Sequence, residues 1–290
     1  MKKAVLASAC LAAALVLSGC EQPNANGEED VSEALRSVNV IDESNLNELM
    51  LNAGSPEEAI AYFRGASADN PGRIDLKRGL AGSLVRGGKH AEGARVWAEV
   101  VAMPGATNED RVSHADALIR AGNWEAAEAE LNGIPPTHET YSRYRLEAMI
   151  ADSNKQWQKA DSFYEIAAGL TTTPSGVLNN WGFSKLTRGE YREAERLFAE
   201  AVKYDPSLFT AKNNMALARA AQRNYDLPIV PMSQAERAQL LHTLALGAVK
   251  QGDVTIGKSL LRQAIDTSPQ HFEAAVRSLE ALEAGELTAG

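Results

Sequence analysis

The sequence predicts an all-α protein in which similar helical hairpins stack into an α-solenoid. Of the 290 residues, 48 are alanine and only 17 are aromatic, a composition that favours closely packed helices over sheets. A set of small and bulky residues also recurs at a spacing of 33 or 34 positions, as in repeat proteins. The net charge of −9 provides no basic surface for a phosphate backbone, so we expect no nucleic-acid partner.

Residues 1–19 have the pattern of an export signal that is removed from the mature protein. Lys2 and Lys3 form a basic head, and the apolar stretch 4–17 is too short to span a bilayer as a stable helix. The stretch ends in Leu17-Ser18-Gly19-Cys20, which resembles the lipobox of bacterial lipoproteins. This resemblance implies that Cys20 becomes the N-terminus and carries diacylglycerol and an N-acyl chain. An ordinary secretion signal is the alternative.

Residues 20–40 are expected to form the acylated N-terminus and a flexible tether. The segment 21–30 is polar and contains Pro, Gly and a run of acidic residues; about 20 such residues have a root-mean-square reach of roughly 25 Å. Cys10 leaves with the signal and Cys20 carries lipid, so the mature chain has no thiol for a disulfide, a metal or catalysis. The covalent lipid is the one attached group that we expect, and we expect no other cofactor.

The segment 175–208 contains the landmarks of one complete repeat. Counted from Ser175 as position one, positions 8, 15, 17, 20, 24, 27 and 32 hold Gly182, Gly189, Tyr191, Ala194, Phe198, Ala201 and Pro206. This pattern resembles the tetratricopeptide (TPR) repeat, which implies a right-handed superhelix of helical hairpins. Small residues at positions 8 and 20 let the paired helices approach closely, and the Gly at position 15 forms the turn.

The same numbering fits the chain from residue 41 to residue 226. Position 20 is small in Ala59, Gly93, Ala127, Ala160 and Ala194. Position 24 is bulky in Phe63, Trp97, Leu131, Tyr164 and Phe198. Near the C-terminus another unit contains Leu241, Ala245, Gly252, Gly257, Leu261, Ala264 and Pro269. The recurrence predicts about six TPR hairpins.

Residues 227–233 are expected to interrupt the repeats. The segment 209–225 supplies a first helix, and its second helix is missing, because Pro228 and Pro231 remove backbone donors and favour extended geometry before them. Ser233 then begins a capping box and a long helix. Residues 234–290 would contain the C-terminal TPR unit, a capping helix and a tail.

The sequence favours a binding function over an enzyme, and we predict no catalytic residues and no metal site. The five histidines lie far apart, without the three- or four-residue spacing of a helical metal site. Residues 252–259 match the phosphate-binding pattern G-x-x-x-x-G-K-S. That loop requires a preceding buried strand, yet the apolar spacing before it is helical. A nucleotide-binding enzyme is therefore a remote alternative.

The candidate binding surface is the groove that TPR proteins form from positions 2, 5, 6, 9, 12 and 13 of each first helix. Carried over to this sequence, these positions include Arg78, Arg86, Arg120 and Arg145. The guanidinium fork suits carboxylates and peptide carbonyls, which indicates an acidic or C-terminal peptide segment as ligand. The alternative is that these arginines pair with Asp and Glu of neighbouring helices.

Two asparagine pairs, 179–180 and 213–214, recur one repeat apart. The resemblance to TPR proteins implies that Asn at position 6, here Asn180 and Asn214, holds the backbone of a ligand. The alternative is that these residues only pack between helices.

The chain as a whole resembles the TadD family of the tight-adherence (Flp) pilus system. The resemblance rests on the lipobox at Cys20, the TPR units, and the block 227–283 with its LPIVPM and QLLHTLAL segments. It implies an outer-membrane lipoprotein on the periplasmic face that helps the pilus secretin to reach the membrane and multimerise, and so supports adhesion. The residue after Cys20 is Glu21 and not the Asp that often retains lipoproteins in the inner membrane. This sequence permits sorting to the outer membrane. The TPR core equally fits type IV pilus pilotins, the TPR component of the β-barrel assembly machine, and adaptors of cell-wall hydrolases.

Overall fold

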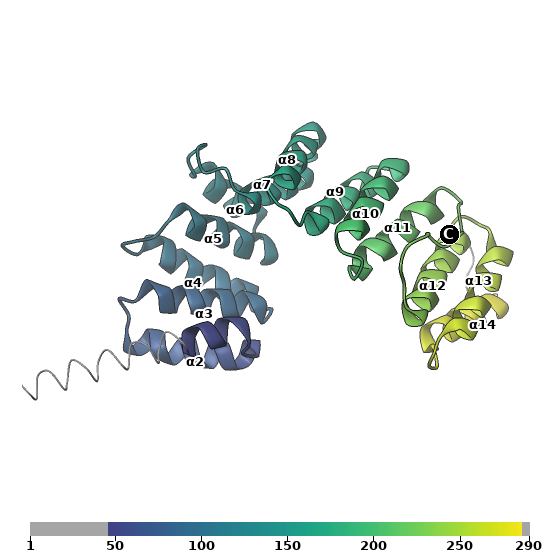
Figure 1. Cartoon of the computed structure of the whole chain (residues 1–290), viewed down its shortest axis with the longest axis horizontal. Helices are drawn as coiled ribbons and strands as arrows, with labels where there is room; N and C mark the ends of the chain where they lie inside the picture. Colours follow the sequence, from purple (N-terminus) through teal and green to yellow (C-terminus); the bar gives the residue numbers. More distant parts are fainter. Residues whose placement is uncertain (1–45, 286–290) are drawn as a thin grey trace, which may run out of the picture. The chain divides into compact units, whose positions relative to one another are not determined.

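The computed structural model describes residues 46–285, and this part of the chain contains helices and no strand. The chain divides into two units, residues 1–55 and 56–290. In the first unit, residues 46–52 are helical. The second unit contains the helices labelled α2 to α14 in Figure 1. The predicted signal peptide, Cys20 and the tether lie outside the described residues.

Helical hairpins with three-residue turns make up most of the second unit. They are α3 (Ile74–Arg86) with α4 (His90–Ala102), α5 (Asn108–Arg120) with α6 (Trp124–Asn132), α7 (Tyr141–Ser153) with α8 (Trp157–Gly169), α9 (Ser175–Thr187) with α10 (Tyr191–Tyr204), and α12 (Gln234–Lys250) with α13 (Val254–Thr267). The remaining helices are α2 (Pro56–Asp69), α11 (Phe209–Ala221) and α14 (Glu273–Glu283). Successive helices pack on one another along the chain.

The core lies between paired helices and follows the repeat numbering. Four of the small residues at position 20 are fully buried, namely Ala59, Ala127, Ala160 and Ala194. The bulky residues at position 24 are also buried, among them Phe63, Tyr164 and Phe198. A small residue on one helix therefore leaves room for the neighbouring helix, and the large side chain four residues later fills the space between them.

The turn between α12 and α13 shows why glycine occupies positions 15 and 20. Gly252 has a φ of +85°, a left-handed conformation that glycine adopts without strain. At Gly257, a Cβ atom would lie 2.5 Å from Cγ2 of Val249. These two glycines belong to the segment that matches the phosphate-loop pattern, so the pattern falls on a turn between two helices instead of the strand and loop that nucleotide binding requires.

The segment 222–233 contains no helix and separates α11 from α12. Val230 packs against the core of α9 to α11, whereas Leu227 and Met232 pack against the core of α12 and α13. Ser233 forms a capping box with Glu236 and begins α12. Helix α11, which has no hairpin partner after it, packs directly on α12.

We predict that Gly257→Val lowers the thermal unfolding midpoint by about 2–10 °C, because the larger side chain must displace Val249 at about 1–3 kcal/mol. Gly65→Val is the matched control, since Gly65 lies in a helix with no neighbouring atom within 4 Å of its Cβ position. Circular dichroism during heating measures both variants. Equal shifts in the two variants would contradict the close helix approach.

Candidate binding surface

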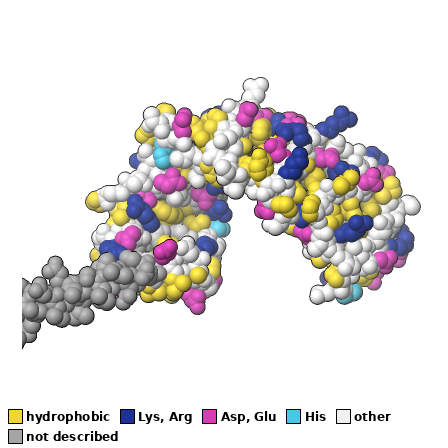
Figure 2. All heavy atoms as spheres, viewed as in Figure 1, with side chains coloured by type: hydrophobic (Ala, Val, Ile, Leu, Met, Phe, Trp, Pro, Cys, Tyr) yellow, Lys and Arg dark blue, Asp and Glu magenta, His cyan; other side chains and the backbone are white. Residues whose placement is uncertain are grey.

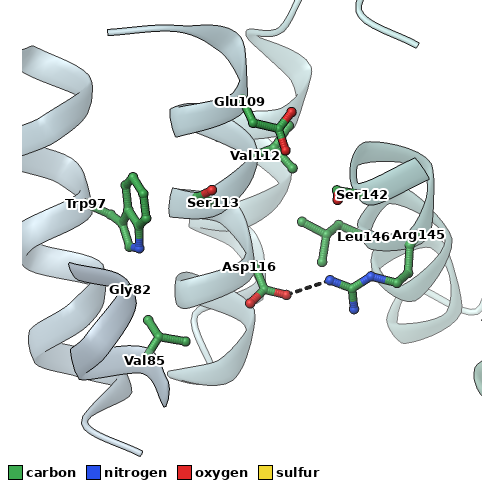
Figure 3. Close-up of a pocket in the computed structure, with 10 residues that line it drawn as sticks. All are labelled: Gly82, Val85, Trp97, Glu109, Val112, Ser113, Asp116, Ser142, Arg145 and Leu146. Atoms are coloured by element: carbon green, nitrogen blue, oxygen red, sulfur yellow. Dashed lines mark hydrogen bonds and ion pairs between the residues drawn. The ribbon is translucent and has the colours of Figure 1, made fainter. Parts of the chain in front are cut away.

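Two pockets open on the face formed by the first helices of the hairpins. The first, here called the charged pocket, measures about 230 Å³ and is lined mainly by α3, α5 and α7 (Figure 3). The second, here called the aromatic pocket, measures about 590 Å³ and is lined by α7, α9 and α11 together with Trp124 at the start of α6 and with Trp157 and Tyr164 of α8. Of the six residues that the sequence indicates, Arg145 lines the charged pocket, and Asn180 and Asn214 line the aromatic pocket.

The charged pocket contains an aspartate that is shared by two of the predicted arginines. Asp116 on α5 points toward Arg145 on α7 in Figure 3, with Oδ1 accepting from Nη2 at 2.9 Å. The other carboxylate oxygen of Asp116 accepts from Nε of Arg120 at 2.5 Å. Two guanidinium groups thus flank one carboxylate, and Glu109 adds a second carboxylate to the lining of this pocket.

Arg78 also pairs with an aspartate of α5. Its Nε and Nη2 each donate to a carboxylate oxygen of Asp110 at 2.7 Å, in a two-pronged arrangement. Burial of the Asp110 carboxyl opposes ionisation, but the hydrogen bonds from Arg78 and Thr107 outweigh it and hold the pKa of Asp110 below its usual value. Arg86, the fourth predicted arginine, is exposed at the end of α3.

The structure therefore places Arg78 and Arg145 in ion pairs with aspartates of a neighbouring helix, α5, which is the alternative to ligand binding, whereas Arg120 pairs with Asp116 within α5 itself. All three partners are aspartates of the same chain, Asp110 or Asp116. An acidic ligand would have to compete with these aspartates, and binding of such a ligand stays a prediction.

The asparagine pairs form a ladder of hydrogen bonds between neighbouring first helices. Asn214 is buried, and its Nδ2 donates to Oδ1 of Asn179 at 3.1 Å. One unit further on, the hydroxyl of Thr243 donates to Oδ1 of Asn213 at 2.7 Å. In each case position 6 of one unit donates to position 5 of the preceding unit. Asn180 and Asn214 both line the aromatic pocket.

Large apolar side chains stay exposed around the aromatic pocket. The exposed fractions are 38% for Trp124, 36% for Trp157 and 50% for Phe183. The arginine hypothesis did not consider these residues. Their signal was present in the repeat numbering, because Phe183 and Met149 occupy position 9 of their first helices, and both tryptophans occupy position 17.

Asp152 is the one charged residue that lines the aromatic pocket. Its carboxylate accepts hydrogen bonds from the hydroxyl groups of Ser184 at 2.6 Å and Tyr164 at 2.8 Å. Burial raises the pKa of Asp152 because desolvation outweighs these hydrogen bonds. The pocket therefore combines aromatic surface, amide groups and a single carboxylate.

A match to the tetratricopeptide repeat model covers residues 180–227, which include part of α9, all of α10 and α11, and the beginning of the interruption. The chain folds as a TPR-type α-solenoid. The sequence-based prediction of this fold class is confirmed. The TPR fold is typical of non-catalytic proteins that bind other proteins, and within residues 46–285 no three His, Cys, Asp or Glu side chains are grouped so that they could hold a metal ion.

Solved TPR structures resemble the chain in fold at low sequence identity. The APC/C hetero-tetramer Cut9-Hcn1 aligns with a TM-score of 0.58 at 14% identity, over 81% of this chain and 47% of the other. The human IFIT1 dimer with PPP-AAAA gives 0.55 at 16% identity, over 80% of this chain and 60% of the other. A tetratricopeptide repeat protein from Parabacteroides merdae gives 0.55 at 13% identity, over 82% of this chain and 96% of the other. A search of curated proteins found no matching sequence.

We predict that Arg78→Ala destabilises the protein by about 1–3 kcal/mol at pH 7, because it removes the cation from a carboxylate that is only 5% exposed. The lowered pKa of Asp110 in the folded state means that this stabilisation is present above the unfolded pKa of about 3.9 and is lost as the pH falls. The difference between wild type and variant should therefore shrink below about pH 4.

Thermal unfolding at pH 7 and pH 3 measures this difference. The control is Arg64→Ala, since Arg64 forms an exposed ion pair with Glu92 and its loss should cost less than about 1 kcal/mol. A variant of Arg78 that unfolds like the Arg64 control at pH 7 would show that the pair with Asp110 is not structural.

Proposed function

We propose that the protein is a lipid-anchored scaffold that holds a segment of a partner protein on its first-helix face. The observation that carries this proposal is the aromatic pocket, where exposed Phe183 lies beside the amide groups of Asn180 and Asn214. An extended segment would bury apolar side chains against the aromatic rings and present its backbone to the amides. This use of Asn180 and Asn214 is the role that the resemblance to TPR proteins implies.

We place this scaffold at the periplasmic face of a bacterial outer membrane, anchored through lipid on Cys20. The support is the lipobox-like sequence before Cys20 and the absence of the retaining Asp at Glu21. Among the helices of residues 46–285, none has both the length and the hydropathy needed to cross a bilayer. Two or more acyl chains would provide a durable anchor.

The partner that we propose is the pilus secretin or another component of the tight-adherence machinery. This assignment rests on the resemblance of the lipobox, the TPR units and the block 227–283 to the TadD family. The scaffold would hold secretin subunits near the membrane while they multimerise. A TPR lipoprotein could also belong to another envelope machine. The proteins that copurify with this lipoprotein would distinguish those machines from the pilus system.

The charge distribution supports a protein partner over a nucleic acid. The IFIT1 structure contains PPP-AAAA, yet its likeness to this chain is one of fold. Here the net charge is −9, and Arg78, Arg120 and Arg145 already pair with aspartates. On the face shown in Figure 2, acidic and basic side chains of the described residues are interspersed. A phosphate-rich ligand would meet no concentrated positive field on this face.

We predict that Cys20→Ala moves the protein from the membrane fraction to the soluble fraction or leaves it unprocessed, because Cys20 is the proposed acylation site. Cys10→Ala is the matched control, since Cys10 lies in the signal and should not affect anchoring. Fractionation and mass spectrometry of the N-terminal peptide measure the outcome. Membrane retention of Cys20→Ala together with an unlipidated wild-type peptide would overturn the anchor.

We predict that Phe183→Ala combined with Asn180→Ala reduces partner capture at least about tenfold while the unfolding midpoint changes little, because Phe183 is half exposed. Ile166→Ala is the control, because Ile166 is 40% exposed and does not line either pocket. Capture is measured by crosslinking the intact lipoprotein in cells, purifying it and quantifying the proteins recovered.

Recovery of the secretin would support the pilus assignment. Recovery of barrel-assembly subunits or murein hydrolases would replace it with one of the alternatives. Equal capture by wild type and the double variant would overturn the first-helix face as the binding surface.

A further inference from the structure

Several aromatic side chains line the aromatic pocket. Trp124, Trp157 and Phe183 are each more than one third exposed, although each lies in a folded helical hairpin. The ring of Tyr164 lines the same cavity and is buried. Aromatic rings arranged in this way attract cations through their negative faces, with Trp the strongest of them.

The orientation of Trp157 shows that a cation already binds one of these rings. The guanidinium carbon of Arg188 lies 5.3 Å from the centre of the Trp157 ring. Arg188 is held in this position by Asp161, to which its Nη2 and Nη1 donate at 2.6 and 3.2 Å. This contact fixes the indole in place before any ligand arrives, which lowers the entropic cost of binding.

Asp152 supplies the charge that an incoming cation would meet. Its carboxylate accepts hydrogen bonds from two neutral hydroxyl groups, those of Ser184 and Tyr164, and the described residues give it no ion pair. Arg188 attracts this carboxylate only at longer range, and the hydrogen bonds of Arg188 are directed at Asp161. The two hydroxyl donors keep the carboxylate oriented in the pocket and leave its negative charge unneutralised at short range.

We propose that the aromatic pocket binds a lysine or arginine side chain of the partner segment, with the aliphatic stem against Phe183 and Trp124 and the charged end toward Asp152. This inference rests on the proposed scaffold function and specifies its ligand. The volume of about 590 Å³ lies in the range of about 300–1,000 Å³ typical of ligand sites and accommodates such a side chain together with its neighbours. Long basic side chains pair an apolar stem with a charged end, which matches this lining.

An acidic side chain does not fit this pocket, because it would face Asp152 and the negative faces of the rings. Arg145 and its partner Asp116 line the other pocket, the charged one. The charge preference of the aromatic pocket is therefore opposite to the one that the arginines indicated from sequence. A partner segment that fits it carries a basic residue among apolar ones.

Amino-acid probes test this charge preference directly. The probes are the N-acetyl methylamides of lysine, arginine, norleucine and glutamate, titrated into the full-length acylated protein in detergent micelles. The indole N–H signals of Trp124 and Trp157 are followed by NMR and assigned through Trp124→Leu and Trp157→Phe. We expect the lysine and arginine probes to shift both signals at concentrations about tenfold lower than norleucine, and the glutamate probe to have no effect.

The variants separate charge recognition from loss of fold. Asp152→Asn should weaken the lysine probe about tenfold and leave norleucine unchanged, because asparagine keeps an oxygen acceptor for a hydroxyl group but removes the charge. Trp124→Leu should weaken the lysine probe as well, and Ile256→Ala, an exposed residue outside the pocket, should have no effect. An unshifted unfolding midpoint shows that Asp152→Asn is folded.

Equal affinity for lysine and norleucine, or an Asp152→Asn variant that binds lysine like wild type, would overturn the proposal. Lysine selectivity that disappears only in unfolded variants would overturn it too. Partner capture that depends on Phe183 and Asn180 but not on Asp152 would leave the scaffold function intact and reject only the basic ligand. Capture that is independent of Phe183 and Asn180 would reject the scaffold face itself.

Discussion

The close approach of the two helices within each hairpin is the constraint on which the rest of the structure depends. It requires a small residue where the helices meet, and Ala115 with Ala127 and Ala148 with Ala160 supply such contacts, all of them without solvent exposure. Because the helix axes are close, each first helix has one fixed face buried against its partner. Positions 5, 6 and 9 are then turned toward the neighbouring first helices. The binding surface is a consequence of this packing.

Charge on the first-helix face is mostly neutralised within the chain. Arg78 on α3 lies against Asp110 and Arg145 on α7 lies against Asp116, so these two arginines join α3 and α7 to α5, whereas Arg120 pairs with Asp116 within α5. Helix α5 is central to this arrangement because it carries both aspartates. Beyond α7 the amide ladder of α9, α11 and α12 joins neighbouring first helices, and an ion pair between Lys212 and Glu236 also links α11 to α12. The lining of the aromatic pocket contains one charged residue, Asp152, whereas arginine and acidic side chains line the charged pocket.

The repeat numbering was sufficient to predict the fold class, because the small and bulky landmarks recur at fixed intervals and each has a packing reason. It also led to the prediction that four arginines and two asparagines line one groove, namely Arg78, Arg86, Arg120, Arg145, Asn180 and Asn214. It could not predict the partners of the arginines, because Asp110 and Asp116 reach them through side-chain directions that depend on how neighbouring hairpins stack. Position 9 also places Phe183 on the first-helix face. A single sequence does not show whether neighbouring side chains bury an apolar residue at that position or leave it exposed.

The asparagines differ from one another in a way that the sequence pattern does not show. Asn214 is buried and committed to Asn179, whereas Asn180 contacts only the sulfur of Met149, at 3.9 Å, in the hydrogen bonds described. Both occupy position 6, and they differ in the residue at position 5 of the preceding unit. For Asn214 that residue is Asn179, which provides an amide oxygen as acceptor. For Asn180 it is Arg145, whose guanidinium has no acceptor and donates to Asp116. The amide donor of Asn214 is thus engaged within the chain, which leaves its Oδ1 for a ligand backbone, whereas the amide of Asn180, one unit earlier, keeps its donor for a ligand.

The interruption at residues 222–233 leaves the first-helix face continuous. The missing second helix would have packed on the opposite side of α11, and Val230, Leu227 and Met232 take over part of that core. Because α12 packs directly on α11, Thr243 reaches Asn213 with the same position 6 to position 5 hydrogen bond that joins Asn214 to Asn179. Contacts between successive first helices therefore keep the first-helix face aligned even though one hairpin lacks its second helix.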